Sequence, residues 1–294
     1  MARRLISLDA EGPAVIDEVM AVGCRRLRVH VRRPRRPVGP PLLVINGIGA
    51  ALDLLDPFVD ALPDDRDIIR FDPPGIGGSP NTLLPYHMTT FAPVLGDLVA
   101  KLGHDHVDVL GYSWGGALAQ QLAIVRPKQV RRLVLVATTT GALAVPASPR
   151  VLRRLLDPRW PRDPATAQSV ATEVYGGTVR THPERAAATL AGIAKSVHRG
   201  RRGYAQQLAA TVGWTSLPLL RLIRARTLVI AGEDDPIIPS FNATVLGRGI
   251  PDARVHRHAG GHLAIITEAP ELATAVAEFL GAPETLSVAA ARRG

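Results

Sequence analysis

Residues 107–123, VDVLGYSWGGALAQQLA, are the stretch that decides the fold. The apolar run that opens the stretch predicts a buried strand, and WGGALAQQLA (114–123) predicts a helix. Between them GYSWG (111–115) forms a G-x-S-x-G pattern at a strand-to-helix turn. A serine in such a turn has its hydroxyl above the sheet, next to helix N–H groups that favour negative charge. Ser113 is therefore the candidate nucleophile.

The rest of the chain alternates in the same way between short apolar runs and helical patterns. Continuous apolar strands separated by helices are typical of a parallel sheet covered on both faces, so we predict an α/β fold. The predicted strands are 41–46, 66–72, 106–113, 131–139, 225–234 and 253–258. A further strand at 25–32 alternates Leu27, Val29 and Val31 with Arg26, Arg28, His30 and Arg32, which predicts a solvated arginine face.

One segment, 141–222, shows only helical patterns. An insertion that follows a strand at the carboxyl edge of an α/β sheet lies over the place where such sheets bind ligands, so we expect a lid there. The predicted organisation is a mostly parallel core from 1–140 and 223–282, a helical lid at 141–222 and a flexible tail at 283–294.

Composition narrows the class of protein. The 294 residues are 46% apolar, enough for one large core, and no stretch approaches the length of a membrane span. The N-terminal residues lack the apolar region of a secretory signal, and the single Cys24 fits a reducing cytoplasm, where we expect the protein to lie. The net charge of +9 comes mostly from arginine, but no nucleic-acid-binding motif accompanies it. We therefore expect no nucleic-acid partner; an anionic or amphiphilic surface is the more plausible partner.

A serine nucleophile needs a base and an orienting acid, in the chain order Ser, Asp or Glu, His. The loop after the strand 225–234 offers EDD (233–235); Asp235 is favoured because Pro236 fixes the chain after it, and Asp234 is the alternative. His262 follows the last strand in a loop of small residues, where a general base is expected. His256 and His258 lie on a strand, where we expect a solvated face and no metal site, since no partner ligands accompany them.

The negative charge of an acyl-transfer intermediate needs two N–H donors. One is expected from Trp114, the residue after the serine, and the other from the glycine-rich loop after 41–46, where Gly47 and Gly49 flank Ile48. The same loop lacks the third glycine of a dinucleotide fingerprint, so we expect no nucleotide cofactor. No metal or other cofactor is expected.

Five motifs in this order resemble the α/β-hydrolase superfamily, namely NGIGA, FDPPGIGGS, GYSWGG, GEDDPIIP and GGH. NGIGA, GYSWGGALAQQLA and AGEDDPIIP together resemble the intracellular medium-chain-length polyhydroxyalkanoate depolymerases. The likeness continues through VYGG, GYAQQL and GWTSLPLL of the predicted lid and covers about 40 to 280. The sequence departs from many superfamily members at Asn46, where they have histidine, and departs from the depolymerases in its arginine-rich N-terminal segment and lid.

The resemblance implies a cytoplasmic, granule-associated serine hydrolase of polyester bonds with the triad Ser113, Asp235 and His262. Residues expected to contact substrate are Asn46, Trp160, Tyr175, Tyr204 and Trp214, although the aromatic ones could equally form the core of the lid. A small-molecule carboxylesterase or lipase and a cofactor-free perhydrolase would share these residues. A non-catalytic binding protein on the same scaffold is disfavoured because all three triad members are present. The sequence does not fix the oligomeric state, the side-chain length of the substrate or endo against exo cleavage.

Overall fold

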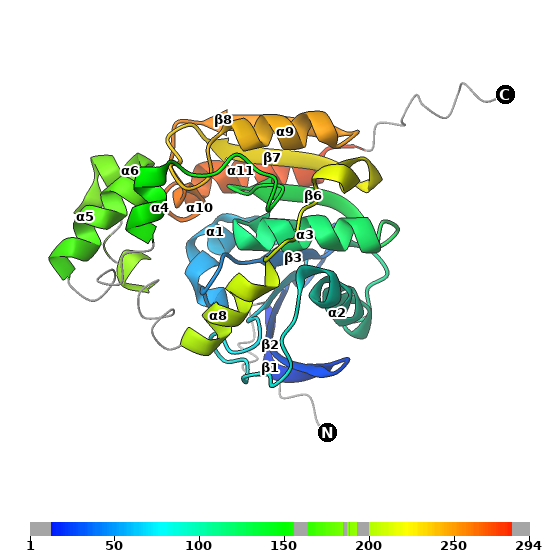
Figure 1. Cartoon of the computed structure of the whole chain (residues 1–294). Helices are drawn as coiled ribbons and strands as arrows, with labels where there is room; N and C mark the ends of the chain where they lie inside the picture. The colour runs from blue at the N-terminus through cyan, green and yellow to red at the C-terminus, as the bar shows by residue number, and fades with distance from the viewer. Residues whose placement is uncertain (1–12, 156–163, 185–186, 188, 193–199, 284–294) are drawn as a thin grey trace.

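The central feature of the computed structural model is one eight-stranded sheet (Figure 1). The structure describes residues 13–155, 164–184, 187, 189–192 and 200–283. The strand order is β1-β2-β4-β3-β5-β6-β7-β8; β1 and β2 pair antiparallel, as do β2 and β4, and all other neighbours are parallel. The strands are β1 (Ala14–Val22), β2 (Arg25–Arg33), β3 (Leu42–Ile45), β4 (Ile68–Phe71), β5 (Val107–Tyr112), β6 (Val130–Val136), β7 (Arg226–Gly232) and β8 (Ala253–His258).

Helices cover both faces of this sheet. One hydrophobic cluster lies between the sheet and α2, α3 and α9, and a second lies between the sheet and α1, α10 and α11. The core helices are η1 (Leu52–Leu55), α1 (Asp56–Ala61), α2 (Met88–Lys101), α3 (Trp114–Val125), α9 (Phe241–Gly249), α10 (Ala264–Thr267) and α11 (Ala269–Gly281). The predicted α/β fold with a mostly parallel sheet is confirmed. Strand β5 is buried along its whole length, as expected for the centre of a doubly covered sheet.

Between β6 and β7 the described chain is helical. The elements are α4 (Pro149–Leu155), α5 (Pro164–Tyr175), α6 (Gly177–Thr181), α8 (Arg201–Ala210) and η2 (Leu217–Leu222). The two connections of this segment to the core form an isolated bridge between Gly141 and Thr215. Helix α3 contacts the chain next to this bridge. Trp214 Nε1 donates to Gln121 Oε1 at 2.8 Å, and Ser216 Oγ donates to Gln120 Oε1 at 2.6 Å. The helical segment is thus tied to the helix that follows Ser113.

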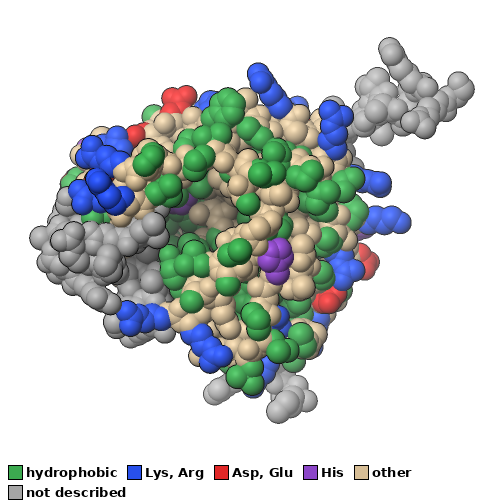
Figure 2. Space-filling model, viewed as in Figure 1, with side chains coloured by type: hydrophobic (Ala, Val, Ile, Leu, Met, Phe, Trp, Pro, Cys, Tyr) green, Lys and Arg blue, Asp and Glu red, His purple; other side chains and the backbone are tan. Residues whose placement is uncertain are grey.

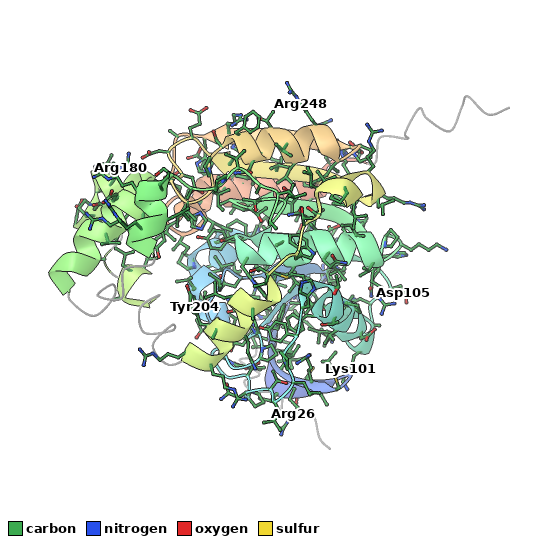
Figure 3. The ribbon with its side chains drawn as sticks, viewed as in Figure 1. Arg26, Lys101, Asp105, Arg180, Tyr204 and Arg248 are labelled. Carbon is green, nitrogen blue, oxygen red and sulfur yellow. The ribbon has the colours of Figure 1, made fainter. Side chains whose placement is uncertain are left out.

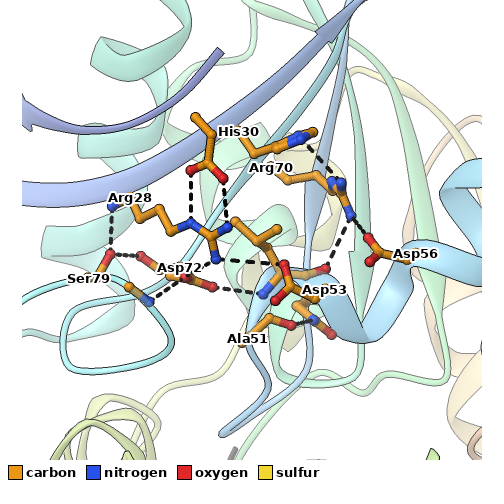
Figure 4. Close-up of polar contacts among 12 residues, drawn as sticks. Arg28, His30, Ala51, Asp53, Asp56, Arg70, Asp72 and Ser79 are labelled. Atoms are coloured by element: carbon orange, nitrogen blue, oxygen red, sulfur yellow. Dashed lines mark hydrogen bonds and ion pairs between the residues drawn. The ribbon is translucent and has the colours of Figure 1, made fainter. Parts of the chain in front are cut away.

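The arginine-bearing strand β2 differs from the prediction. A solvated face was wrong for Arg28, which is half-buried and donates to both carboxylate oxygens of Asp17 on β1, at 2.9 and 2.7 Å (Figure 4). It also lies 3.5 Å from the fully buried carboxylate of Asp72, which follows β4. The paired strand β1 was not predicted, because its exposed and buried residues do not alternate cleanly.

Candidate active site

Ser113 occupies the turn between β5 and α3 in a strained backbone conformation. Its φ is 53°, in the left-handed region that residues with a side chain rarely adopt. The turn is tight because a Cβ on Gly111 would lie 2.4 Å from Gly115 O, and one on Gly115 would lie 2.2 Å from Ile45 O. Only glycine fits at these two positions, which explains the G-x-S-x-G spacing. A hydrogen bond from Ser113 N to Val136 O, at 2.9 Å, holds the backbone in this conformation.

His262 and Asp235 form a hydrogen-bonded chain with this serine. His262 Nε2 lies 3.2 Å from Ser113 Oγ, and His262 Nδ1 lies 2.8 Å from Asp235 Oδ2. Both partners of the serine are buried, with 5% of His262 and 6% of Asp235 exposed. The other carboxylate oxygen of Asp235 accepts the backbone N–H groups of Ile237 and Ile238 at 3.0 and 2.9 Å, which fixes the carboxylate. The three residues expected to act together are therefore brought together, in the arrangement that activates a serine hydroxyl.

Two tyrosines contact the loop that carries His262. Tyr112, the residue before the serine, donates from its hydroxyl to His262 O at 3.0 Å. Burial raises the pKa of the Tyr112 phenol well above its usual range, so the hydroxyl stays a donor. Tyr175, the last residue of α5, accepts the His262 N–H on its backbone oxygen at 2.8 Å, and its ring stacks on the imidazole with centroids 6.4 Å apart. A contact from the helical segment therefore helps to position the imidazole.

Asp234, the alternative acid, faces the helical segment instead of the imidazole. Its carboxylate accepts the backbone N–H of Gly177 at 2.6 Å and an Arg180 guanidinium N–H at 2.9 Å. Figure 3 shows Arg180 on the helices at the edge of the molecule. Geometry thus separates two adjacent carboxylates: Asp235 contacts the histidine, and Asp234 fastens α6 to the core. The sequence did not predict this second contact.

The glycine-rich segment Gly47–Ala51 follows β3 and is the candidate oxyanion loop. The side chain of Asn46 is buried and folds back on this loop, because its Oδ1 accepts from Gly47 N at 2.7 Å and its Nδ2 donates to Ala51 O at 2.6 Å. Both polar groups of the side chain are thus engaged with the loop. Ile48, between the glycines, is half-buried, and Trp114 begins α3.

The aromatic residues expected near substrate fall into three places. Tyr175 lies against the histidine, and Trp214 is buried at the base of the helical segment. Tyr204 is half-buried on α8 (Figure 3). Trp160 lies outside the described residues. Between α4 and the start of α3 the surface is hollowed, and apolar side chains gather around the hollow (Figure 2).

The remaining histidines of β8 have structural contacts. A solvated face was wrong for His258, which is buried and accepts from Gly260 N at 3.1 Å while lying 3.4 Å from Glu268. His256 stacks beside it, with ring centroids 6.4 Å apart. Across the described residues, no group of three potential metal-binding side chains occurs. Within the same part of the chain, no helix is both long and apolar enough to cross a membrane.

Comparison with known proteins identifies the family of the chain. Residues 40–269 match the family model of the alpha/beta hydrolase fold. The chain is 42% identical over 248 residues to a poly(3-hydroxyalkanoate) depolymerase from Ectopseudomonas oleovorans, covering 84% of this chain and 87% of that protein. The expected resemblance to these depolymerases is confirmed.

Solved structures of similar fold include two hydrolytic enzymes. The enol-lactonase from Burkholderia xenovorans superposes with a TM-score of 0.77 at 25% identity, covering 90% of this chain and all of that one. An esterase from Exiguobacterium antarcticum superposes with a TM-score of 0.75 at 20% identity, covering 90% of this chain and 98% of that one, and shows the fold alone. The chain is an enzyme that belongs to the alpha/beta hydrolase fold family.

Proposed function

We propose that this hydrolase cleaves the ester bonds of an aliphatic polyester, a medium-chain-length polyhydroxyalkanoate, through an acyl-enzyme on Ser113. The observation that carries the proposal is the chain of contacts from Ser113 Oγ through His262 to Asp235, at 3.2 and 2.8 Å. The substrate class is supported by the name of the relative with 42% identity, a poly(3-hydroxyalkanoate) depolymerase.

The acylation step uses the serine and histidine directly. Ser113 Oγ attacks the ester carbonyl carbon while His262 Nε2 takes the hydroxyl proton. The imidazolium that forms keeps its Nδ1 proton hydrogen-bonded to Asp235, whose carboxylate stabilises the positive charge without taking the proton. His262 then returns the other proton to the leaving alcohol as the ester C–O bond breaks.

The developing oxyanion is held by the backbone N–H groups of Ile48 and Trp114 in this proposal. Each such donor typically contributes about 3 kcal/mol to lowering the barrier. The Trp114 N–H is the first of α3, where the helix dipole adds to the attraction for negative charge. In the second half of the reaction, water activated by His262 attacks the acyl-serine and releases a 3-hydroxy acid or a shorter oligomer. The proposed steps require no metal or cofactor.

The helical segment 141–222 is proposed to act as the lid of this site. The contact of its Tyr175 with the histidine, through both ring and backbone, supports this role. Aromatic and aliphatic side chains from α5 and α6 continue the hydrophobic cluster of the core, and Tyr175, Tyr204 and Trp214 are proposed to line an acyl groove. An apolar groove suits the alkyl side chains of a polyester.

Arginines of the proposed lid are proposed to dock the enzyme on an anionic granule surface. Within the proposed lid, Arg150 and Arg154 pair with Glu173, and Arg180 pairs with Asp234, so these side chains are partly neutralised. Location in the cytoplasm and at the granule surface stays a prediction. Granule binding that does not change between low and high salt would contradict docking through arginine.

The test compares polymer and small esters. Purified protein is incubated with medium-chain-length polyhydroxyalkanoate granules, and released 3-hydroxy acids are measured by mass spectrometry alongside hydrolysis of p-nitrophenyl octanoate. The proposal predicts release from the granules that depends on Ser113. Hydrolysis of the small ester with no release from the polymer would make the chain a small-molecule esterase, and peracid formation with acetate and hydrogen peroxide as the dominant activity would make it a perhydrolase.

A further inference from the structure

A fully buried glutamine of α8 contacts both sides of the proposed oxyanion hole. Gln207 Oε1 accepts the backbone N–H of Gly49 in the oxyanion loop at 2.7 Å. The backbone oxygen of Gln207 accepts the indole N–H of Trp114, the residue after the serine, at 3.1 Å. One residue of the helical segment thus joins two core segments that lie far from it in the sequence, 158 and 93 positions away.

The Gly49 contact sets the geometry of the peptide beside the donor. Asn46 Oδ1 fixes the N–H of Gly47 on one side, and Gln207 Oε1 fixes the N–H of Gly49 on the other. The peptide that carries the Ile48 N–H lies between these two fixed peptides. The φ of Gly49 is 71°, which glycine adopts without strain. Because glycine is also flexible, the hydrogen bond to Gln207 restricts the loop to this conformation.

The orientation of the Gln207 amide is determined by its partner. Because Gly49 N–H is a donor, the amide oxygen must face it, which leaves Nε2 at a defined position. Nε2 is buried and has no hydrogen-bond partner within the described part of the chain. A buried donor without an acceptor lowers stability. An apolar side chain of the same size would remove this donor together with the acceptor of the Gly49 N–H, so stability alone gives glutamine no clear advantage here.

The packing of α8 on the core fixes the position of Gln207 relative to the oxyanion loop. Gly203 on α8 packs directly against Gly75 in the loop after β4, where an added Cβ would lie 2.5 Å from Gly75 O. The side chain of Gln206 donates to Thr82 O at 3.1 Å, on the side of α8 that faces the loop leading to α2. The helix is thus fixed against the core at a glycine contact one turn before Gln207.

We propose that Gln207 is a positioning residue of the oxyanion hole. It orients the Ile48 N–H through Gly49 and steadies Trp114 through its indole, so the helical segment contributes to catalysis and not only to substrate access. This inference rests on the proposed function of Ser113 and of the two N–H donors.

The test replaces Gln207 with the apolar residue closest to it in shape. Gln207→Met removes the acceptor of the Gly49 N–H and also the unpartnered Nε2, so the melting temperature should stay within about 4 °C of the parent chain. The concentration of active sites is measured by labelling with a fluorophosphonate to completion. The kcat per labelled site for p-nitrophenyl octanoate should fall about 10- to 100-fold. The KM should change less than about twofold, because the ground state does not use the oxyanion donors fully. Gln207→Leu repeats the measurement should the methionine variant fold poorly.

Gln206→Met is the matched control, on the same helix with a contact away from the oxyanion loop. It should keep the parental kcat within about twofold. A Gln207→Met variant with the parental kcat per labelled site, or with its loss confined to KM, would overturn the inference. The parent and Ser113→Ala are assayed in parallel: an inactive Ser113→Ala beside an unaffected Gln207→Met defeats the positioning role alone, whereas an active Ser113→Ala defeats the proposed function.

Discussion

Gly177, the first residue of α6, packs its backbone directly against the backbone of the loop that carries His262. A Cβ placed on Gly177 would lie 2.1 Å from Gly261 N, and Gly261 directly precedes His262. The φ of Gly177 is 50°, so a side chain there is strained as well as crowded. We therefore expect Gly177→Ala to push the helical segment and the histidine loop apart.

The size of the effect follows from these distances. A Cβ essentially never comes closer than 3.0 Å, so the contact must open by at least about 0.9 Å from 2.1 Å. We expect part of that movement to displace His262, which directly follows Gly261. Its Nε2 is already 3.2 Å from Ser113 Oγ, so a shift of a few tenths of an ångström would exceed the limit of a hydrogen bond. A misplacement near 1 Å in a catalytic group costs about 100-fold, so kcat/KM should fall about 10- to 100-fold. The left-handed alanine should also cost about 1–2 kcal/mol of unfolding free energy.

The assay is steady-state hydrolysis of p-nitrophenyl octanoate, together with a thermal melt. Gly192→Ala is the matched control, because Gly192 lies in the same inserted segment with nothing within 4 Å of its added Cβ. The control should change kcat/KM by less than about twofold. If Gly177→Ala hydrolyses the ester at the parental rate, the helical segment does not position the histidine, and the reasoning from these contacts is wrong.

Three further predictions concern carboxylates around the site. Asp235→Asn should lower kcat by about 10³- to 10⁴-fold with little change in melting temperature, because the imidazole loses its orienting acceptor; loss below tenfold would exclude Asp235 as the acid. Asp234→Asn should keep kcat within about threefold while lowering the melting temperature, since this carboxylate holds Gly177 and Arg180; a loss of kcat matching that of Asp235→Asn would reverse the two assignments. The 3.4 Å contact with His258 and the hydrogen bond that Thr178 Oγ1 donates at 3.0 Å lower the pKa of Glu268 below its usual 4.5. The stability that the carboxylate contributes is therefore present above that pH and lost as the pH falls below it. Glu268→Gln should therefore lower the melting temperature at pH 7, by a margin that shrinks as the pH falls below 4.5; a margin independent of pH would rule out this pairing.

The core of the fold could be predicted because its strands are buried on both faces. Runs such as 41–45 and 133–137 are apolar throughout, which is typical of strands in a doubly covered sheet. Strand β1 could not be predicted, since an edge strand buries few residues and its pattern is weak. The pairing of Arg28 with Asp17 depends on that strand, so a face that alternation alone describes as solvated is in part an ion-pair network.

The residues of the candidate site likewise divide into those that the sequence predicts and those that it does not. Ser113, Asp235 and His262 could be anticipated, because each lies at or just after the end of a predicted strand, and the carboxyl ends of parallel strands meet at one edge of a sheet. The contacts of Tyr175 and Gln207 could not, since they depend on how a helical segment far along the chain packs on the core. The motifs VYGG and GYAQQL contain these residues, and resemblance alone indicated that they matter. Asp234 shows the limit most clearly, because two adjacent carboxylates differ only in the direction of their side chains.

The most direct test of the proposed mechanism is covalent labelling of Ser113. The protein is treated with a fluorophosphonate, digested and examined by mass spectrometry, and polymer hydrolysis is measured before and after treatment and for Ser113→Ala. The mechanism predicts a single adduct on Ser113, loss of hydrolysis in proportion to labelling, and an unlabelled, inactive Ser113→Ala that melts near the temperature of the parent. A Ser113→Ala variant that releases 3-hydroxy acids at the parental rate, or an adduct on a residue other than Ser113, would contradict it.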